Sequence, residues 1–234
     1  MGTVGRMALA RFTALCIDAN DPEKMARFWA PALGLPVAEE VPTGFKLSGD
    51  TPEQTVWLNQ VPEEKTVKHR VHLDLHGAGI DDYPGATPLS AEGEFPWRVM
   101  ADPEGGEFCF FVRDPVPEQK LYEVVVDSAD PAAQATWWHD VLGGRLQHNE
   151  NPDEAWSWLE DVPGMPFECL VFSTVPEVKL AKNRIHWDIE VPDQRTVEQL
   201  IALGAGLLRP PDDDIKWCIL VDPEGNEFCV FLPE

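Results

Sequence analysis

The sequence predicts an α+β fold that contains two copies of one small domain, and two observations support this prediction. First, three motifs recur in the same order along the 234 residues. Residues 17–22 match residues 126–131, residues 68–75 match residues 182–189, and residues 102–109 match residues 222–229. Second, short apolar runs that are typical of strands alternate with segments that carry the start and stop signals of helices.

The repeat is too long for one unit of a solenoid, so each copy is expected to be a domain. A chain of 234 residues could also form one large domain, but the internal repeat favours two. We place the domains at residues 8–113 and 120–234. The segment between them contains Pro115 and Pro117 with polar or charged neighbours, which is typical of a linker.

Each copy is expected to begin with a strand, a helix and three further strands. In the second copy, residues 122–127 are rich in β-branched side chains and predict the first strand. Asp130 is a suitable N-cap, and Pro131 suits the first position of a helix. Gly143 and Gly144 then end this helix near residue 142.

The same order is expected again in the second half of each copy. In the second copy, a strand at 184–191 precedes a helix from Asp193 to Gly204, and three strands follow. The first copy differs at this point, because Pro84 and Gly85 make a long helix unfavourable. We therefore expect a degenerate or missing second helix in the first copy.

Composition excludes some classes of function. The formal net charge of -23 argues against nucleic-acid and anionic membrane partners, and solubility is its simplest explanation. No apolar run approaches the roughly 18 residues of a membrane-spanning helix. Residues 1–11 lack the apolar centre of a signal peptide. The five cysteines lack metal-finger spacing, so we expect reduced thiols in a cytoplasmic protein.

The repeated motifs resemble the glyoxalase-like branch of the vicinal oxygen chelate superfamily, which includes bleomycin-resistance proteins and extradiol dioxygenases. The likeness rests on an Asp-Pro helix start, a Lys-x-Arg-x-His-x-Asp strand and a closing Asp-Pro-Glu-Gly-x-Glu-Phe-Cys hairpin. It covers nearly the whole chain as two adjacent copies. It implies that paired βαβββ modules curl into incomplete barrels whose concave faces hold a metal or a small ligand.

The resemblance also implies positions for the metal ligands, on the first and last strands of each module. In the first copy they are Ala14, approximately Asn59, His72 and Cys109, and in the second copy they are Glu123, approximately Ser173, His186 and Cys229. The family usually has a Glu on the last strand, where both copies have Cys, and Ala14 cannot ligate a metal. Glu123, His186 and Cys229 could hold zinc, although His and Cys are also ordinary buried residues. We expect no cofactor, with a divalent metal in the second copy as the alternative.

Strand alternation places further polar residues beside these positions. His72 and Asp74 share one face of their strand, and His186 and Asp188 share the equivalent face. Each Asp could orient the imidazole or take a proton from a substrate, or it could simply be solvated. The face itself could line a cavity or be an ordinary solvent face.

The nine tryptophans are further candidates for ligand binding or for packing in the core. Trp97 and Trp217 occupy equivalent positions and suit a site for an aromatic or hydrophobic ligand. Trp29, Trp137 and Trp138 are instead expected to pack the first helix of each copy against its sheet.

Two interpretations of function follow, because no nucleophile triad, phosphate loop or dinucleotide motif is present. We prefer a metal-independent protein that binds a small molecule, related in role to drug-sequestering resistance proteins. The alternative is a lyase-, isomerase- or hydrolase-type enzyme that uses His186 and Asp188, or a metal, in the second copy. The candidate catalytic residues are His186, Asp188, His72 and Asp74, and the candidate ligand-binding residues are Glu123, His186, Trp217, Cys229, His72, Trp97 and Cys109.

The two copies also bear on assembly. Two fused copies could act as an internal pseudo-dimer, so the chain is expected to be a monomer in this form or else a homodimer. If only one copy is active, we expect it to be residues 120–234, because this copy keeps its second helix and has Glu123 where the first copy has Ala14.

Overall fold

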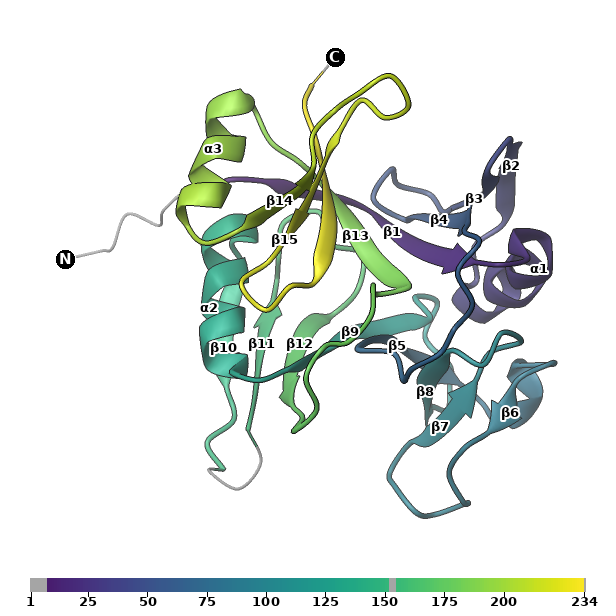
Figure 1. Cartoon of the computed structure of the whole chain (residues 1–234). Helices are drawn as coiled ribbons and strands as arrows, with labels where there is room; N and C mark the ends of the chain where they lie inside the picture. The colour runs from purple at the N-terminus through teal and green to yellow at the C-terminus, as the bar shows by residue number, and fades with distance from the viewer. Residues whose placement is uncertain (1–7, 152–154, 234) are drawn as a thin grey trace.

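The computed structural model describes residues 8–151 and 155–233 and contains four modules, two in each copy (Figure 1). The predicted absence of a signal peptide concerns residues 1–11, of which 1–7 lie outside the described residues. Among the helices of the described chain, none has both the length and the apolar character needed to cross a membrane.

The first copy supplies modules 1 and 2. Module 1 consists of β1 (Arg11–Ala19), α1 (Pro22–Leu33), β2 (Val37–Val41), β3 (Gly44–Ser48) and β4 (Thr55–Gln60). Module 2 consists of β5 (Val71–Gly77), the 3-10 helix η1 (Ile80–Asp82), β6 (Thr87–Pro88), β7 (Arg98–Ala101) and β8 (Glu107–Val112).

The second copy supplies modules 3 and 4. Module 3 consists of β9 (Leu121–Ser128), α2 (Pro131–Leu142), β10 (Arg145–His148), β11 (Trp156–Glu160) and β12 (Cys169–Thr174). Module 4 consists of β13 (Ile185–Glu190), α3 (Gln194–Ala202), β14 (Gly206–Arg209), β15 (Cys218–Val221) and β16 (Glu227–Phe231). The predicted start of α2 is confirmed, since the Asp130 side chain accepts a hydrogen bond from Ala133 N and Pro131 is the first helical residue.

The strands form two eight-stranded sheets, and neither sheet belongs to one copy. Sheet A has the order β14-β15-β16-β13-β1-β4-β3-β2, and sheet B has the order β10-β11-β12-β9-β5-β8-β7-β6. β1 pairs antiparallel with β13, and β5 pairs antiparallel with β9. Modules 1 and 4 therefore share sheet A, and modules 2 and 3 share sheet B. A site at the centre of either sheet, where β1 meets β13 or β5 meets β9, would contain residues of both copies.

Side-chain packing, in contrast, joins the two modules of one copy. In the first copy, Trp29 of α1 makes an edge contact with Phe108 of β8, with ring centroids 5.5 Å apart. In the second copy, Trp138 of α2 contacts Trp187 of β13 at 4.9 Å and Phe228 of β16 at 5.1 Å. These two helical tryptophans therefore bridge to the second module of their own copy, whose strands belong to the other sheet.

Each Asp-Pro-Glu-Gly turn is hydrogen-bonded to the backbone where the first helix of its copy begins. Glu104 accepts hydrogen bonds from Asn20 N at 3.0 Å and Asp21 N at 2.7 Å. Glu224 makes the equivalent contacts with Ala129 N and Asp130 N, at 3.0 and 2.8 Å. These contacts support the structural role that the sequence predicts for the turn.

The short η1 replaces the second helix of the first copy, as the sequence predicts, and Tyr83 fills the space beside it. Its side chain is buried against Phe108 and Phe110, and its hydroxyl donates to His76 O at 3.1 Å. Burial raises the pKa of this hydroxyl, so it remains a donor. One buried aromatic side chain thus packs beside η1, the element that takes the place of α3 in the order of module 2.

Replacing Tyr83 by phenylalanine is expected to lower the free energy of unfolding by about 1 kcal/mol, because the ring packing stays and one buried hydrogen bond is lost. Urea denaturation would measure this difference. A loss greater than about 3 kcal/mol would show that the hydroxyl has a larger role than this single bond.

Candidate functional site

The candidate site lies on the face of each sheet opposite the helices, which we call the inner face. On β1 this face carries Ala14, Cys16 and Asp18, while Leu15 and Ile17 point into the helix-covered core. Because β1 pairs with β13 and β13 with β16, three strands bring polar side chains together at the centre of sheet A.

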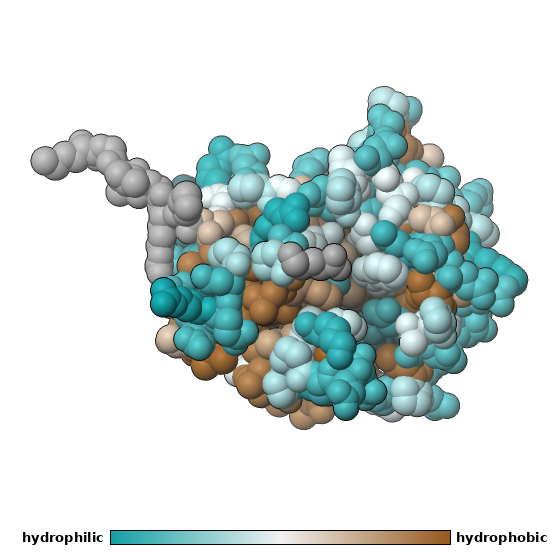
Figure 2. Space-filling model, turned by 90° about the horizontal axis from the view of Figure 1, so that it is seen from above, coloured by the Kyte–Doolittle hydropathy of each residue, from teal (hydrophilic) through white to brown (hydrophobic). Residues whose placement is uncertain are grey.

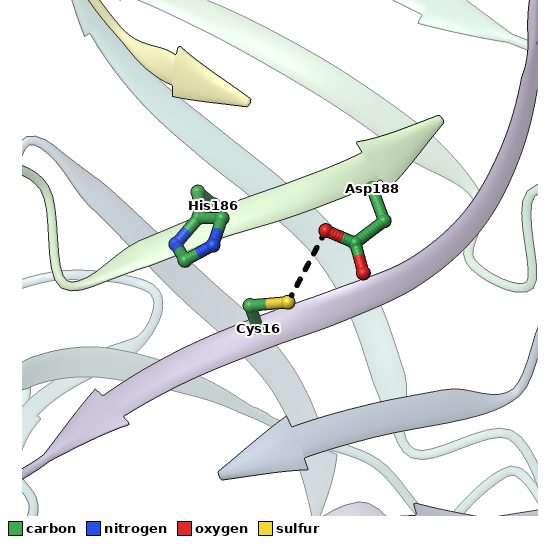
Figure 3. A group of neighbouring side chains, drawn as sticks. All are labelled: Cys16, His186 and Asp188. Carbon is green, nitrogen blue, oxygen red and sulfur yellow. Dashed lines mark hydrogen bonds between the residues drawn. The ribbon is translucent and has the colours of Figure 1, made fainter. Parts of the chain in front are cut away.

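Group A, at the centre of sheet A, consists of Cys16, His186 and Asp188, which Figure 3 shows, together with Cys229. Cys16 lies opposite His186 in the strand register, and its Sγ donates to Asp188 Oδ1 at 3.4 Å. Cys229 is the register neighbour of Asp188 on β16 and also interacts with its carboxylate. All four side chains are buried, and His186 Nδ1 has no hydrogen-bond partner among the described residues.

Burial controls the ionisation of group A. It raises the pKa of Cys16 and of Cys229, and the nearby Asp188 carboxylate raises both further. Burial also raises the pKa of Asp188, an effect that the neighbouring His186 and the hydrogen bonds from the two thiols oppose. The thiols therefore keep their protons and donate hydrogen bonds to the Asp188 carboxyl group.

Group B, at the equivalent place on sheet B, consists of His72, Asp74 and Cys109. His72 Nε2 lies 3.4 Å from Asp74 Oδ1, and Cys109 is the register neighbour of Asp74 on β8. Burial lowers the pKa of His72 to about 4. Burial, together with the charge of Glu123, raises the pKa of Asp74 to about 8. At neutral pH, the Asp74 carboxyl group is therefore mostly protonated and can donate a proton. The His72 imidazole is neutral and can accept one.

The two groups differ because β1 and β9 carry different residues at equivalent positions. In sheet A, Ala14 lies opposite Asp188, whereas in sheet B Glu123 lies opposite Asp74. Sheet B therefore holds two facing carboxyl groups, and burial raises the pKa of Glu123 to about 7. The position of Cys16 is taken by Val125 in sheet B, opposite His72, so the second thiol is absent from group B.

The structure regroups the residues that the sequence proposed as metal ligands. Glu123 lies in sheet B, whereas His186 and Cys229 lie in sheet A, so these three weak candidates do not meet. His72 and Cys109 share a sheet with Glu123 instead. The regrouping follows from strand pairing between copies.

The approximate positions Asn59 and Ser173 also follow this pairing. Asn59 lies opposite Asp18 on β1, and Ser173 lies opposite Asp127 on β9. Both therefore lie at the ends of the inner faces and are separated from the two groups by one residue pair of the strand register.

Cys16 is a functional candidate that the sequence did not predict. Its alternation with Ala14 and Asp18 on β1 is visible in the sequence, but its partner His186 lies 170 residues away in the other copy. Only a prediction that β1 pairs with β13 of the other copy could have placed Cys16 beside His186. With Cys16 included, one nitrogen, one sulfur and one oxygen donor atom of Cys16, His186 and Asp188 all lie within 4.8 Å of one another.

Half-buried aromatic side chains border both groups. Trp217 stacks on Phe231 with ring centroids 5.1 Å apart, and it lies beside Cys229 of group A. Trp97 lies 5.7 Å from Phe111, which follows Cys109 on the same face of β8. The equivalent tryptophans thus occupy equivalent places at the two inner faces.

The basic residues before each His-x-Asp strand pair with the other copy. Lys68 Nζ lies 2.8 Å from Asp127 Oδ2, and Lys182 forms the equivalent ion pair with Asp18. Arg184 Nη1 lies 3.0 Å from Glu104 Oε2. The main partners of these cations are therefore carboxylates of the opposite copy.

Comparison with known proteins is consistent with this architecture. The family model described as "Glyoxalase-like domain" matches residues 14–111 and 123–231. A search of curated proteins finds no match.

Several solved structures share the fold. Glyoxalase I from Zea mays is 17% identical, with a TM-score of 0.70 over 94% of this chain and 92% of that chain. A putative dioxygenase from Bacillus subtilis subsp. subtilis str. 168 is 11% identical, with a TM-score of 0.65 over 96% of this chain and 86% of that chain. The cppA protein from Streptococcus pneumoniae TIGR4 is 10% identical, with a TM-score of 0.53 over 96% of this chain and all of that chain (100%). At these identities the likeness shows the fold alone.

Proposed function

The chain belongs to the glyoxalase-like domain family, and on this premise we propose that it binds a small aromatic or apolar molecule at its inner faces without a metal. The observation that carries the proposal is the equivalent placement of Trp97 and Trp217. Each is half-buried and borders a compact polar group in a sheet whose other face is covered by the core. Apolar surface with a few fixed polar groups is the usual composition of a small-molecule site.

The identity of the inner-face residues supports binding without a metal. Ala14 offers no donor at the first-strand position of sheet A. Cys229 stands where the family usually has a Glu, and its raised pKa keeps the thiol protonated beside Asp188. In this state group A satisfies much of its own hydrogen bonding without a metal.

A screen of small aromatic fragments tests this proposal by tryptophan fluorescence and melting temperature. We expect a bound fragment to quench fluorescence and to raise the melting temperature. Replacing Trp217 by leucine should remove the response of sheet A, and replacing Trp97 by leucine should remove that of sheet B. A response that survives both leucine variants would contradict the proposal.

A second candidate function is a lyase- or isomerase-type enzyme, and the geometry of group A favours it. Cys16, His186 and Asp188 supply sulfur, nitrogen and oxygen donors within 4.8 Å, and His186 Nδ1 has no partner among the described residues. This donor set suits zinc, which accepts all three atom types, and a metal held there would polarise a substrate oxygen. In sheet B, the protonated Asp74 beside a neutral His72 could move a proton to or from a bound substrate.

Zinc binding distinguishes the two candidates. If group A holds zinc, protein purified without chelator should contain the metal, and His186→Ala should abolish the binding at this group, measured by competition with a chromogenic chelator; His72, Asp74 and Cys109 of group B also lie within 4.8 Å of one another, and zinc held there would survive His186→Ala. His148→Ala on β10 is the control, because His148 pairs with Ser157 away from both groups. Protein that fails to bind added zinc and keeps its melting temperature with chelator would rule out the metal-dependent form of the enzyme.

The cellular compartment, the oligomeric state and the class of partner are also proposals. The five cysteines are free thiols, which supports a reducing compartment such as the cytoplasm. Both sheets already join the two copies, which supports a monomer that acts as an internal pseudo-dimer rather than a homodimer. The net charge of -23 supports a small molecule, and neither nucleic acid nor a membrane, as the partner. Light scattering coupled to size exclusion would measure the oligomeric state.

A further inference from the structure

A separate pocket lies between the two segments that connect modules within each copy. Residues 61–70 connect β4 to β5, and residues 175–184 connect β12 to β13; Figure 1 shows these connections in dark blue and green. They enclose a cavity of about 350 Å³, within the usual size range of small-molecule sites. The pocket meets the inner faces only through Asp18 and Asp127, and no residue of group A or group B lines it.

The strongest cations of this pocket are already neutralised. Lys68 pairs with Asp127, and Lys182 pairs with Asp18, so each ammonium group is held by a buried carboxylate of the other copy. Lys65 pairs with Glu107 at 3.0 Å, although its side chain also lines the pocket. These pairs leave little positive charge to attract an anionic ligand.

Three exposed carboxylates line the same pocket. Glu63, Glu64 and Glu177 have no ion-pair partner within residues 8–151 and 155–233. Among the lining cations, only Arg70 similarly lacks a carboxylate partner, and it donates to the backbone carbonyls of Glu177 and Asp127. The pocket therefore has an excess of uncompensated negative charge, within a chain of net charge -23.

One wall of the pocket is unusually apolar for an exposed surface. Leu180 and Val178 are 80% and 74% exposed, the highest values among the large hydrophobic side chains of the described chain. At the equivalent positions the first copy has Thr66 and Glu64. Hydrophobic patches also interrupt the hydrophilic surface on the face that Figure 2 shows. Exposed apolar side chains that line a cavity are typical of a surface that a ligand covers.

A buried histidine in the pocket wall is also without a partner. His69 is 8% exposed, and neither ring nitrogen has a hydrogen-bond partner among the described residues. Its counterpart Asn183 donates to Asn226 Oδ1 at 2.9 Å. The first copy has Gly106 in place of Asn226, and a Cβ there would lie only 2.5 Å from His69 Cε1. The first copy thus leaves one imidazole donor and one acceptor unused.

We propose that this pocket binds a small hydrophobic organic cation, meaning a protonated or quaternary amine attached to an apolar group. Val178 and Leu180 contact the apolar group, and the carboxylates of Glu63, Glu64 and Glu177 balance the charge. The site is distinct from the inner faces and does not depend on the function proposed for them.

Titration calorimetry with benzyltrimethylammonium tests the proposal, with phenylmethanesulfonate as an anionic probe of similar size. We expect saturable binding of the cation that weakens as salt is added, and no binding of the anion. Leu180→Ser should weaken cation binding by roughly tenfold, as should the combined change of Glu63, Glu64 and Glu177 to glutamine. Both changes lie on exposed side chains, so the fold should be retained.

Matched controls separate this site from the rest of the surface. Leu208→Ser removes an exposed leucine of β14, and Glu39→Gln with Glu40→Gln removes exposed carboxylates of β2; none of these residues lines the pocket. Both control proteins, and Trp217→Leu, should bind the cation as the unmodified protein does. The proposal is overturned by absent or non-saturable binding of the cation, by equal binding of the anion, or by unchanged binding in Leu180→Ser.

Discussion

Replacing Asp222 by alanine is expected to lower the free energy of unfolding by about 3–5 kcal/mol, because it leaves several buried donors without an acceptor. Asp222 is 2% exposed and accepts hydrogen bonds from Trp138 Nε1 at 3.2 Å, from Glu224 N at 3.0 Å and from Asn226 N at 2.9 Å. The Gln134 side chain donates to it as well. The change should therefore loosen the closing turn and α2 together.

The repeat provides a matched control for this experiment. Asp102 is the equivalent residue of the first copy and accepts from Glu104 N and Gly106 N, at 2.9 and 2.8 Å. The equivalent tryptophan, Trp29, has no hydrogen-bond partner among the described residues. Asp102→Ala should therefore cost less, about 1–3 kcal/mol. Guanidinium denaturation would compare the two variants, and an equal loss would refute the idea that α2 depends on this carboxylate.

The second large effect is a loss of stability as the pH rises from about 4 to about 8. Asp74 and Glu123 face each other across β5 and β9, and their pKa values are raised to about 8 and about 7, mainly by burial. Burial also raises the pKa of Asp102 and of Asp222 to about 6. The folded protein therefore holds these protons more tightly than the unfolded chain does.

The sign of the effect follows from this difference. A raised pKa contributes stability that is fully present below the ordinary value near pH 4 and is lost as the pH passes through the folded value. A tenfold difference in proton affinity between the folded and unfolded chain is worth about 1.4 kcal/mol, so the buried Asp74 should account for a loss of a few kcal/mol by pH 8. Urea denaturation at several pH values, with chelator present, would measure this slope.

Glu123→Gln identifies the source of the slope. Removing the carboxylate opposite Asp74 should raise the free energy of unfolding at pH 8 and make its decline with pH shallower. Glu198→Gln on the exposed face of α3 is the control and should leave the slope unchanged. An unchanged slope in Glu123→Gln would mean that the two carboxyl groups do not interact in the folded protein.

Local signals were sufficient to predict the modules. The Asp-Pro pair predicts the start of α2, Gly143 ends it, and Pro84 predicts the missing helix of the first copy, because backbone geometry at each point depends on neighbouring residues. Period-two alternation places His72 with Asp74, and His186 with Asp188, on one face of each strand. These features depend on only a few consecutive residues, so they can be read from one sequence.

The sequence by itself therefore determined the duplication, the order of elements in each module and the faces on which the polar residues lie. Only the tertiary structure decided which modules share a sheet, and hence that Cys16 meets His186 while Glu123 meets Asp74. The physical reason is that β5 and β13 carry nearly the same motif, so hydrogen bonding along β1 does not distinguish them. The large aromatic side chains of α1 and α2 pack between the two modules of one copy, and the strand edges of those modules pair with the other copy.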